Sequence, residues 1–141
     1  MGNSQSSTIK INFEDMQTVL KNPEIYLLIN TLVDSEQDCL IRGTIPASQE
    51  EKMINQYVRS NKNVSLIVYG RNSNDEKTIK KYQQLISLGF NNVFIYTGGL
   101  FEWLMLQDIF GFEEFPTTKK QLDFLKYKPQ QQLHVRLIGY G

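Results

Sequence analysis

The chain lacks the residues from which disulfide and zinc scaffolds are built. Its 141 residues contain one cysteine, Cys39, and one histidine, His134. A single cysteine cannot form an internal disulfide, and this usage is typical of proteins in a reducing compartment. One cysteine and one histidine far apart in the sequence do not make a zinc site. We therefore predict an intracellular protein, cytoplasmic or peripheral on a membrane face, with no metal and no cofactor.

The chain also lacks an excess of charge and any long apolar run. Its 15 basic and 15 acidic side chains give a formal net charge of zero. This balance argues against a nucleic-acid partner bound through counterion release. No apolar run approaches membrane-spanning length, and no secretory signal is recognisable. The length and the 40% of hydrophobic residues predict one globular domain with a proper core.

The N-terminal residues carry a candidate lipidation motif. Gly2 follows the initiator methionine and Ser6 stands four residues later, as in N-myristoylation signals. The alternative is an unmodified flexible tail, since residues 1–8 are small and polar. One acyl chain gives only marginal membrane binding, so any membrane association is expected to be weak and reversible.

The chain is organised around residues 65–107. An apolar, β-prone run ends at Gly70, and a polar loop follows as far as Asp75. A helical pattern then begins at Glu76 and stops at Gly89, and it is followed by a second apolar strand over residues 93–96. Two glycines and a further helix complete the unit. Units of this kind build parallel sheets, and their chemistry is carried by the loop after a strand.

The flanking segments are assigned from the same patterns. Residues 25–32 are almost entirely apolar, which is typical of a central parallel strand. Residues 42–47 are expected to form a turn before a helix capped by Ser48. The spacing of Leu122, Phe124 and Leu125 predicts a last helix over residues 119–127 with these side chains buried. The last segment is either a strand or a tail. These assignments give a domain over residues 9–128 and a C-terminal extension over residues 129–141.

Four motifs, in order, resemble those of the rhodanese-like family. They are the buried strand at 25–32, the Gly-Thr-Ile-Pro-Ala turn at 43–47, the strand at 66–70, and the closing Gly-Phe-Asn-Asn-Val at 89–93 with Gly98, Gly99 and Trp103. The likeness covers roughly residues 9–115. It implies an α/β fold of three layers, with a central parallel sheet and helices on both faces.

The departures from the family pattern concern its chemistry. The resemblance places the nucleophilic cysteine of the family at Gly70, and its Asp-x-Arg pair at Asn30 and Leu32. Glycine has no side chain that could attack sulfur or carry a persulfide. Asp75 and Glu76 also place carboxylates at a loop that should bind an anionic donor. We therefore expect no catalytic residue and describe residues 70–76 as a degenerate active-site loop, comprising Gly70, Arg71, Asn72, Ser73, Asn74, Asp75 and Glu76.

The resulting hypothesis is an inactive rhodanese-like domain that binds a protein partner or regulates one. The alternative is a thiosulfate or persulfide sulfurtransferase that uses Cys39 in place of the missing cysteine. Cys39 lies outside the loop, and a free cysteine commonly packs as a small hydrophobic residue. The sequence does not identify the partner.

Overall fold

The computed structural model describes residues 8–133, and the elements follow one another in a regular α/β order. The strands are β1 (Lys10–Ile11), β2 (Tyr26–Asn30), β3 (Thr44–Ile45), β4 (Ser65–Tyr69) and β5 (Asn92–Tyr96). The α-helices are α1 (Phe13–Leu20), α2 (Ala47–Ser60), α3 (Glu76–Ser87) and α4 (Gly99–Phe110). Two short 3₁₀ helices are η2 (Asp34–Glu36) and η3 (Phe124–Tyr127).

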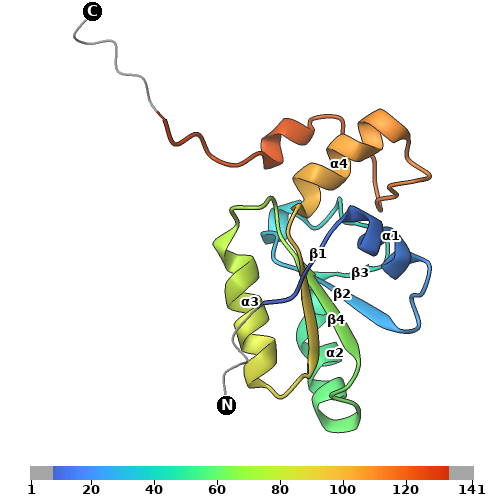
Figure 1. Cartoon of the computed structure of the whole chain (residues 1–141), viewed down its shortest axis with the longest axis vertical. Helices are drawn as coiled ribbons and strands as arrows, with labels where there is room; N and C mark the ends of the chain where they lie inside the picture. The colour runs from blue at the N-terminus through green and yellow to red at the C-terminus, as the bar shows by residue number, and fades with distance from the viewer. Residues whose placement is uncertain (1–7, 134–141) are drawn as a thin grey trace, which may run out of the picture.

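All five strands form one parallel sheet in the order β1-β5-β4-β2-β3 (Figure 1). The central strand β4 pairs with β2 on one side and with β5 on the other, with Leu66 opposite Leu27 and Val93. The predicted strands at 65–69 and 93–96 therefore share a sheet and are buried, as expected for parallel strands covered on both faces. The predicted parallel α/β fold is confirmed.

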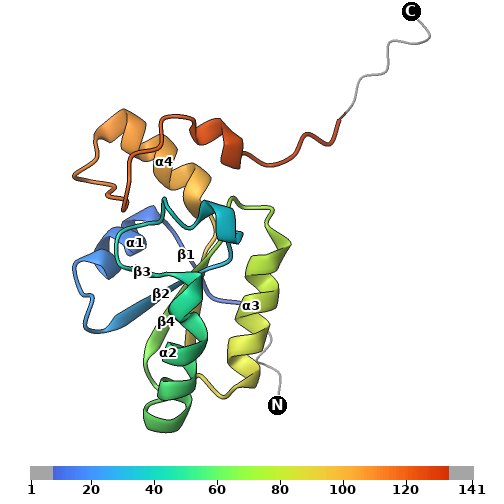
Figure 2. The same ribbon diagram turned by 180° about the vertical axis from the view of Figure 1, so that it is seen from behind.

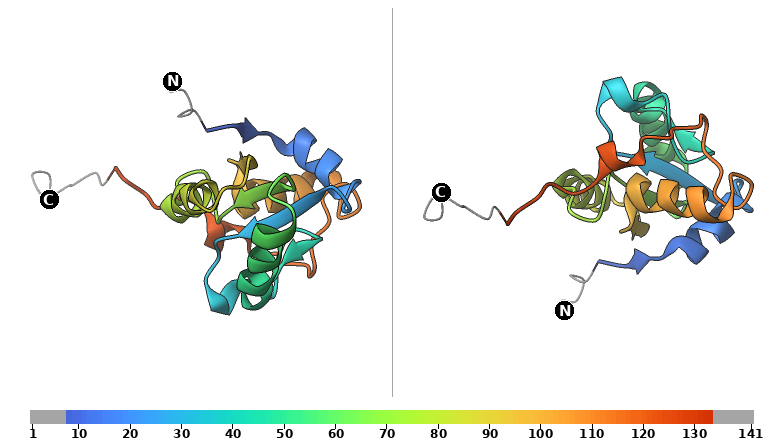
Figure 3. Two further views of the ribbon diagram at one scale, coloured as in Figure 1. Left: turned by 90° about the horizontal axis from the view of Figure 1, so that it is seen from below. Right: turned by 90° about the horizontal axis from the view of Figure 1, so that it is seen from above.

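The helices cover both faces of the sheet, which gives the three layers (Figures 2 and 3). On one face, the core combines α1 and α4 with sheet residues such as Leu28 and Ile67. On the other face, Ile54 of α2 and Leu85 of α3 pack on Leu66 and neighbouring residues. Trp103 of α4, from the closing motif, is fully buried in this core.

The end of α3 shows why the closing motif contains a glycine. Gly89 follows the C-cap residue and has a φ of 102°. Side chains other than that of glycine are strained in this region, and glycine commonly ends helices there. Phe90 then returns to the core, with its N–H donating to the Leu85 carbonyl at 3.3 Å. The predicted helix stop at Gly89 is confirmed.

The predicted last helix over residues 119–127 is wrong. Only η3 is helical there, and Leu122 and Leu125 are exposed by 86% and 55% instead of buried. The competing interaction is with residues 38–41. The Thr118 N–H donates to the Leu40 carbonyl at 2.8 Å, and its hydroxyl donates to the Asp38 carbonyl at 3.2 Å. These bonds hold the chain beside residues 38–41.

Three smaller assignments also differ. Strand β2 is shorter than the predicted residues 25–32 and lies next to the central strand β4, and Ile25 is half exposed in the turn before it. Thr44–Ile45, expected in a turn, forms the edge strand β3 against β2. Helix α2 begins at Ala47 directly after Pro46, so Ser48 is not its cap.

No helix within residues 8–133 has the length and apolarity that crossing a membrane requires. The candidate acylation site Gly2 and the undecided segment after Leu133 lie outside the described residues.

Candidate functional site

Gly70 lies at the carboxyl end of β4, and the start of α4 holds the chain there. The Leu100 N–H donates to the Gly70 carbonyl at 2.9 Å, and the Phe101 N–H donates to the Arg71 carbonyl at 2.8 Å. Gly99, with a φ of 70°, makes this approach possible. A Cβ on Gly99 would lie 2.8 Å from the Asn72 backbone, closer than real contacts allow. The second glycine of the Gly98-Gly99 pair therefore seats α4 against the loop.

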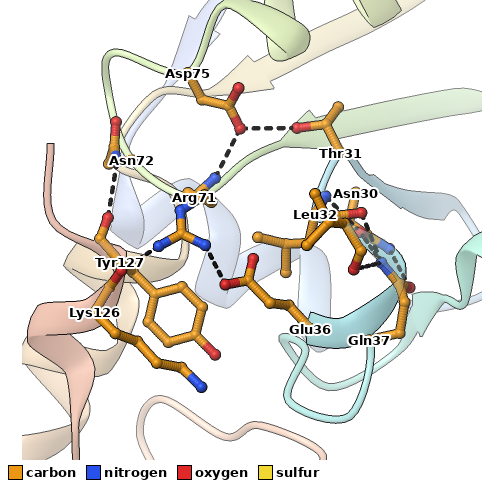
Figure 4. Close-up of polar contacts among 11 residues, drawn as sticks. Asn30, Thr31, Leu32, Glu36, Gln37, Arg71, Asn72, Asp75, Lys126 and Tyr127 are labelled. Carbon is orange, nitrogen blue, oxygen red and sulfur yellow. Dashed lines mark hydrogen bonds and ion pairs between the residues drawn. The ribbon is translucent and has the colours of Figure 1, made fainter. Parts of the chain in front are cut away.

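The Asp75 side chain, which points toward Thr31 in Figure 4, lies in the space that a side chain at Gly70 would need. A Cβ built on Gly70 would overlap Asp75 Oδ2. It would also come within 2.5 Å of Thr78 Oγ1 and 2.7 Å of Thr31 Oγ1. The site at the end of β4 is therefore filled by a carboxylate and two hydroxyl groups, and it is closed to any larger residue without rearrangement.

The Asp75 carboxylate is bound by donors from three segments. Its Oδ2 accepts the Arg71 N–H at 3.1 Å and the Thr31 hydroxyl at 3.2 Å, and its Oδ1 accepts the Lys77 N–H at 3.0 Å. Asp75 is the N-cap of α3, a position where a carboxylate satisfies free backbone N–H groups and faces the positive end of the helix. The backbone N–H groups of Arg71 and Lys77, which could bind an external anion, therefore bind the Asp75 carboxylate instead.

The next two loop residues contact the C-terminal part of the chain. The Arg71 guanidinium forms an ion pair with Glu36, donates to the Lys126 carbonyl, and lies 5.2 Å from the centroid of the Tyr127 ring. Asn72 Nδ2 donates to the Tyr127 carbonyl at 2.8 Å (Figure 4). Both side chains are therefore engaged by η2 or η3.

The remaining loop residues are open to solvent. Ser73, Asn74 and Glu76 are exposed. Their side chains make no hydrogen bond or ion pair with the rest of residues 8–133. They form the accessible rim of the loop.

Asn30, at the first position of the family's Asp-x-Arg pair, forms a neutral amide pair. Asn30 and Gln37 donate to each other's carbonyl oxygens at 3.2 and 2.8 Å. Asn30 Oδ1 also accepts the Leu32 N–H at 2.9 Å, and Gln37 Oε1 accepts the Ala47 N–H at 2.9 Å. These uncharged bonds fix the loop after β2 to the start of α2, with no charged group in the arrangement.

Cys39 is fully buried and lies outside the loop. Its Sγ donates to the Lys119 carbonyl at 3.3 Å. Burial, and to a lesser degree the negative charge of Asp38, raises the pKa of the thiol. A buried thiol held in its protonated form is a poor nucleophile, because the thiolate is the reactive species.

Sequence reasoning missed several residues of this site. Thr31, Glu36 and Tyr127 come from segments distant from the loop in sequence, and Thr78 lies in the first turn of α3, directly after the loop; no local motif marks any of them. Asp75 could have been identified as the N-cap from its place before a helical pattern. Within residues 8–133 no cluster of three or more potential metal ligands occurs.

The fold and the loop define a class of protein, a parallel α/β domain with its site in the loop after the central strand. A sequence profile described as a rhodanese-like domain matches residues 32–106, slightly more than half of the chain. The chain belongs to the rhodanese-like family.

Solved structures show the same fold at low sequence identity. A crystal structure of a protein from Anabaena sp. has 23% identity and a TM-score of 0.56, covering 81% of this chain and 83% of that one. The solution structure of a rhodanese-like domain from Anabaena sp. has 21% identity and a TM-score of 0.55, covering 92% and 91%. Thiosulfate sulfurtransferase from Pseudomonas aeruginosa has 18% identity and a TM-score of 0.60, covering 81% of this chain but 21% of that one. A comparison with curated proteins finds no match.

A double-mutant cycle tests whether Asp75 occupies the space beside Gly70. Gly70→Ala should destabilise the fold by about 1–3 kcal/mol, the usual cost of overpacking. Asp75→Ala should cost about 1 kcal/mol through loss of the helix cap. The double variant should lose less than the sum, because the carboxylate that the new methyl group meets is gone. Urea denaturation measures all three variants, and strictly additive losses would contradict the contact.

Proposed function

We propose that this chain is a rhodanese-like domain without sulfurtransferase activity that binds a protein partner or regulates one. The observation that carries the proposal is the Asp75 carboxylate beside Gly70, bound by the Arg71 N–H at 3.1 Å. According to the family resemblance, Gly70 occupies the position of the family's nucleophilic cysteine. A site with no nucleophile, and with an internal carboxylate held by its donors, favours a role other than catalysis.

Both features, the glycine at position 70 and the nearby carboxylate, oppose sulfur transfer. The reaction needs a thiolate that attacks the donor and then carries the persulfide, and glycine supplies neither function. An anionic donor that approached the loop would also meet the charge of Asp75. A like charge at about 4–6 Å costs on the order of 1 kcal/mol or more at an intermediate dielectric.

Sulfur transfer by wild-type protein is the direct test of inactivity. We expect no turnover with thiosulfate and no persulfide on any residue at neutral pH, because Gly70 cannot react and Cys39 is buried with a raised pKa. Cyanide-coupled turnover and intact-mass analysis of wild type and Cys39→Ser provide the measurement. Activity abolished by Cys39→Ser would establish the sulfurtransferase alternative, and activity that survives it would reveal another catalytic group.

The accessible rim of the loop, Ser73, Asn74 and Glu76, supports a binding role. Loops on a rigid scaffold commonly carry recognition, and here a buried sheet and α4 fix the base of the loop. We propose residues 70–76 as part of the partner surface.

A comparative pull-down tests that surface. The variant Asn74→Arg/Glu76→Arg changes two exposed side chains and leaves the buried contacts of the loop intact. Glu24→Arg, exposed in the turn before β2, is the matched control. A specific partner should be retained by wild type and by the control and lost, about tenfold or more, by the loop variant, as for changes that place charge in an interface. Equal retention by all three proteins would exclude the loop.

Acylation at Gly2 would add a second property, weak attachment to membranes. We propose N-myristoylation there because of the motif Gly2 to Ser6. One chain gives marginal binding, so release from vesicles should be fast and reversible. Intact-mass analysis of protein made in a myristoylating cell measures the modification, and unmodified Gly2 would refute the tether.

A further inference from the structure

The C-terminal segment from Phe124 to Leu133 contacts the loop through η3, and beyond η3 the chain runs away from the body of the domain (Figures 1 and 2). It is bound chiefly through backbone groups. Arg71 donates to the Lys126 carbonyl, and Asn72 donates to the Tyr127 carbonyl at 2.8 Å. Any peptide offers such carbonyl groups, so these contacts do not require this particular sequence.

One aromatic side chain supplies the anchor. Tyr127 is fully buried, whereas Leu125 beside it and Leu122 before it are exposed. The Tyr127 ring lies under the Arg71 guanidinium at 5.2 Å, next to Glu36 (Figure 4). We use the name aromatic socket for the site formed by Glu36, Arg71 and Asn72, in which Tyr127 is seated. This pattern of one buried aromatic group and two backbone carbonyls is how a short peptide is bound.

The fit of Tyr127 is incomplete. Its hydroxyl group is buried and has no hydrogen-bond partner within residues 8–133. Glu36 Oε1, on the wall of the socket, is also buried without a partner there. Unsatisfied buried polar groups cost free energy, so the segment is bound less tightly than burial of its ring alone would allow, and it can be displaced.

Charge complementarity indicates the flanking residues of a ligand. Lys126 and Lys128 stand on either side of Tyr127 in the segment. Glu36, in the socket, is paired with Arg71, whereas the exposed Glu76 lines the same surface hollow as Lys128. The Glu76 carboxylate, which has no ion-pair partner within residues 8–133, favours a basic residue at the position of Lys128.

We propose that residues 124–133 act as a built-in ligand of the aromatic socket, and that a partner docks by displacing them. The partner is a peptide segment that carries an aromatic residue between basic residues, like the Lys-Tyr-Lys that it replaces. This inference rests on the proposed binding function and specifies the chemistry of the partner. The intramolecular segment competes at a high effective concentration, so the socket is mostly closed until a partner or a change in the segment opens it.

Peptide binding to the full-length chain tests the proposal. The probe is a fluorescent peptide of residues 121–131, measured by anisotropy. Tyr127→Ala empties the socket, and Leu122→Ala changes an exposed residue of the same segment as the matched control. The peptide should bind Tyr127→Ala at least tenfold more tightly than it binds wild type or Leu122→Ala. A peptide with alanine in place of tyrosine, or the addition of Arg71→Ala to the protein, should abolish that gain.

A second variant keeps the test decisive if Tyr127→Ala does not fold. Phe124→Ala removes a partly buried residue of the segment that packs on Phe101, with ring centroids 6.5 Å apart, and leaves the socket intact. It should raise peptide affinity severalfold. Equal affinity for wild type and both folded variants, or no binding to either, would overturn the proposal.

The remaining outcomes separate this inference from the proposed function. A wild-type dimer that dissociates when the peptide is added would identify a second copy as the occupant and overturn the proposal of a separate partner. A protein retained through the loop in the pull-down but not competed by the peptide would overturn the socket and leave the binding function standing. Peptide binding as expected, with measurable thiosulfate turnover, would uphold the socket and refute inactivity.

Discussion

The carboxylate of Asp75, bound between β2, β4 and α3, is the contact on which the site depends. It accepts hydrogen bonds from Thr31, the Arg71 N–H and the Lys77 N–H. It caps α3, closes the loop and fills the space beside Gly70. The same arrangement is possible only because residue 70 has no side chain. The absence of a side chain at residue 70 and the inward carboxylate of Asp75 therefore depend on each other.

With the base of the loop fixed in this way, Arg71 and Asn72 extend toward η2 and η3, where they hold backbone carbonyls and one aromatic ring (Figure 4). The N–H of Arg71 binds the Asp75 carboxylate inside the protein, and its guanidinium binds Glu36 and the Lys126 carbonyl. The proposed binding role rests on this division between the backbone and the side chain of Arg71.

The sequence predicted the sheet well, because buried parallel strands are apolar on both faces and stand out as runs. The strands at 65–69 and 93–96 and the helix stop at Gly89 follow from local pattern and are confirmed. The helix predicted over residues 119–127 was wrong. Hydrogen bonds of Thr118 with Asp38 and Leu40, 78–80 residues away, hold this part of the chain in another conformation despite its helical spacing of apolar residues.

The site was predictable only in part. Asp75 was recognised as a charge near the loop, but its inward direction depends on Thr31, which is 44 residues distant. The engagement of Asn72 by Tyr127 spans 55 residues. Contacts of this range depend on the packed fold, and a single sequence carries no local signal for them. The predicted position of Gly70, directly after the central strand β4, agrees with the structure.

The central claim is that Asp75 already uses the donors that an anionic substrate would need. Titration of ¹⁵N-labelled wild-type protein with thiosulfate, followed at the amide resonances of Arg71 and Lys77, tests it most directly, with sodium chloride of equal ionic strength as the control. The account predicts no saturable shift of these two resonances beyond that of the control. Saturable shifts at Arg71 and Lys77, with thiosulfate bound in place of the Asp75 carboxylate, would contradict it.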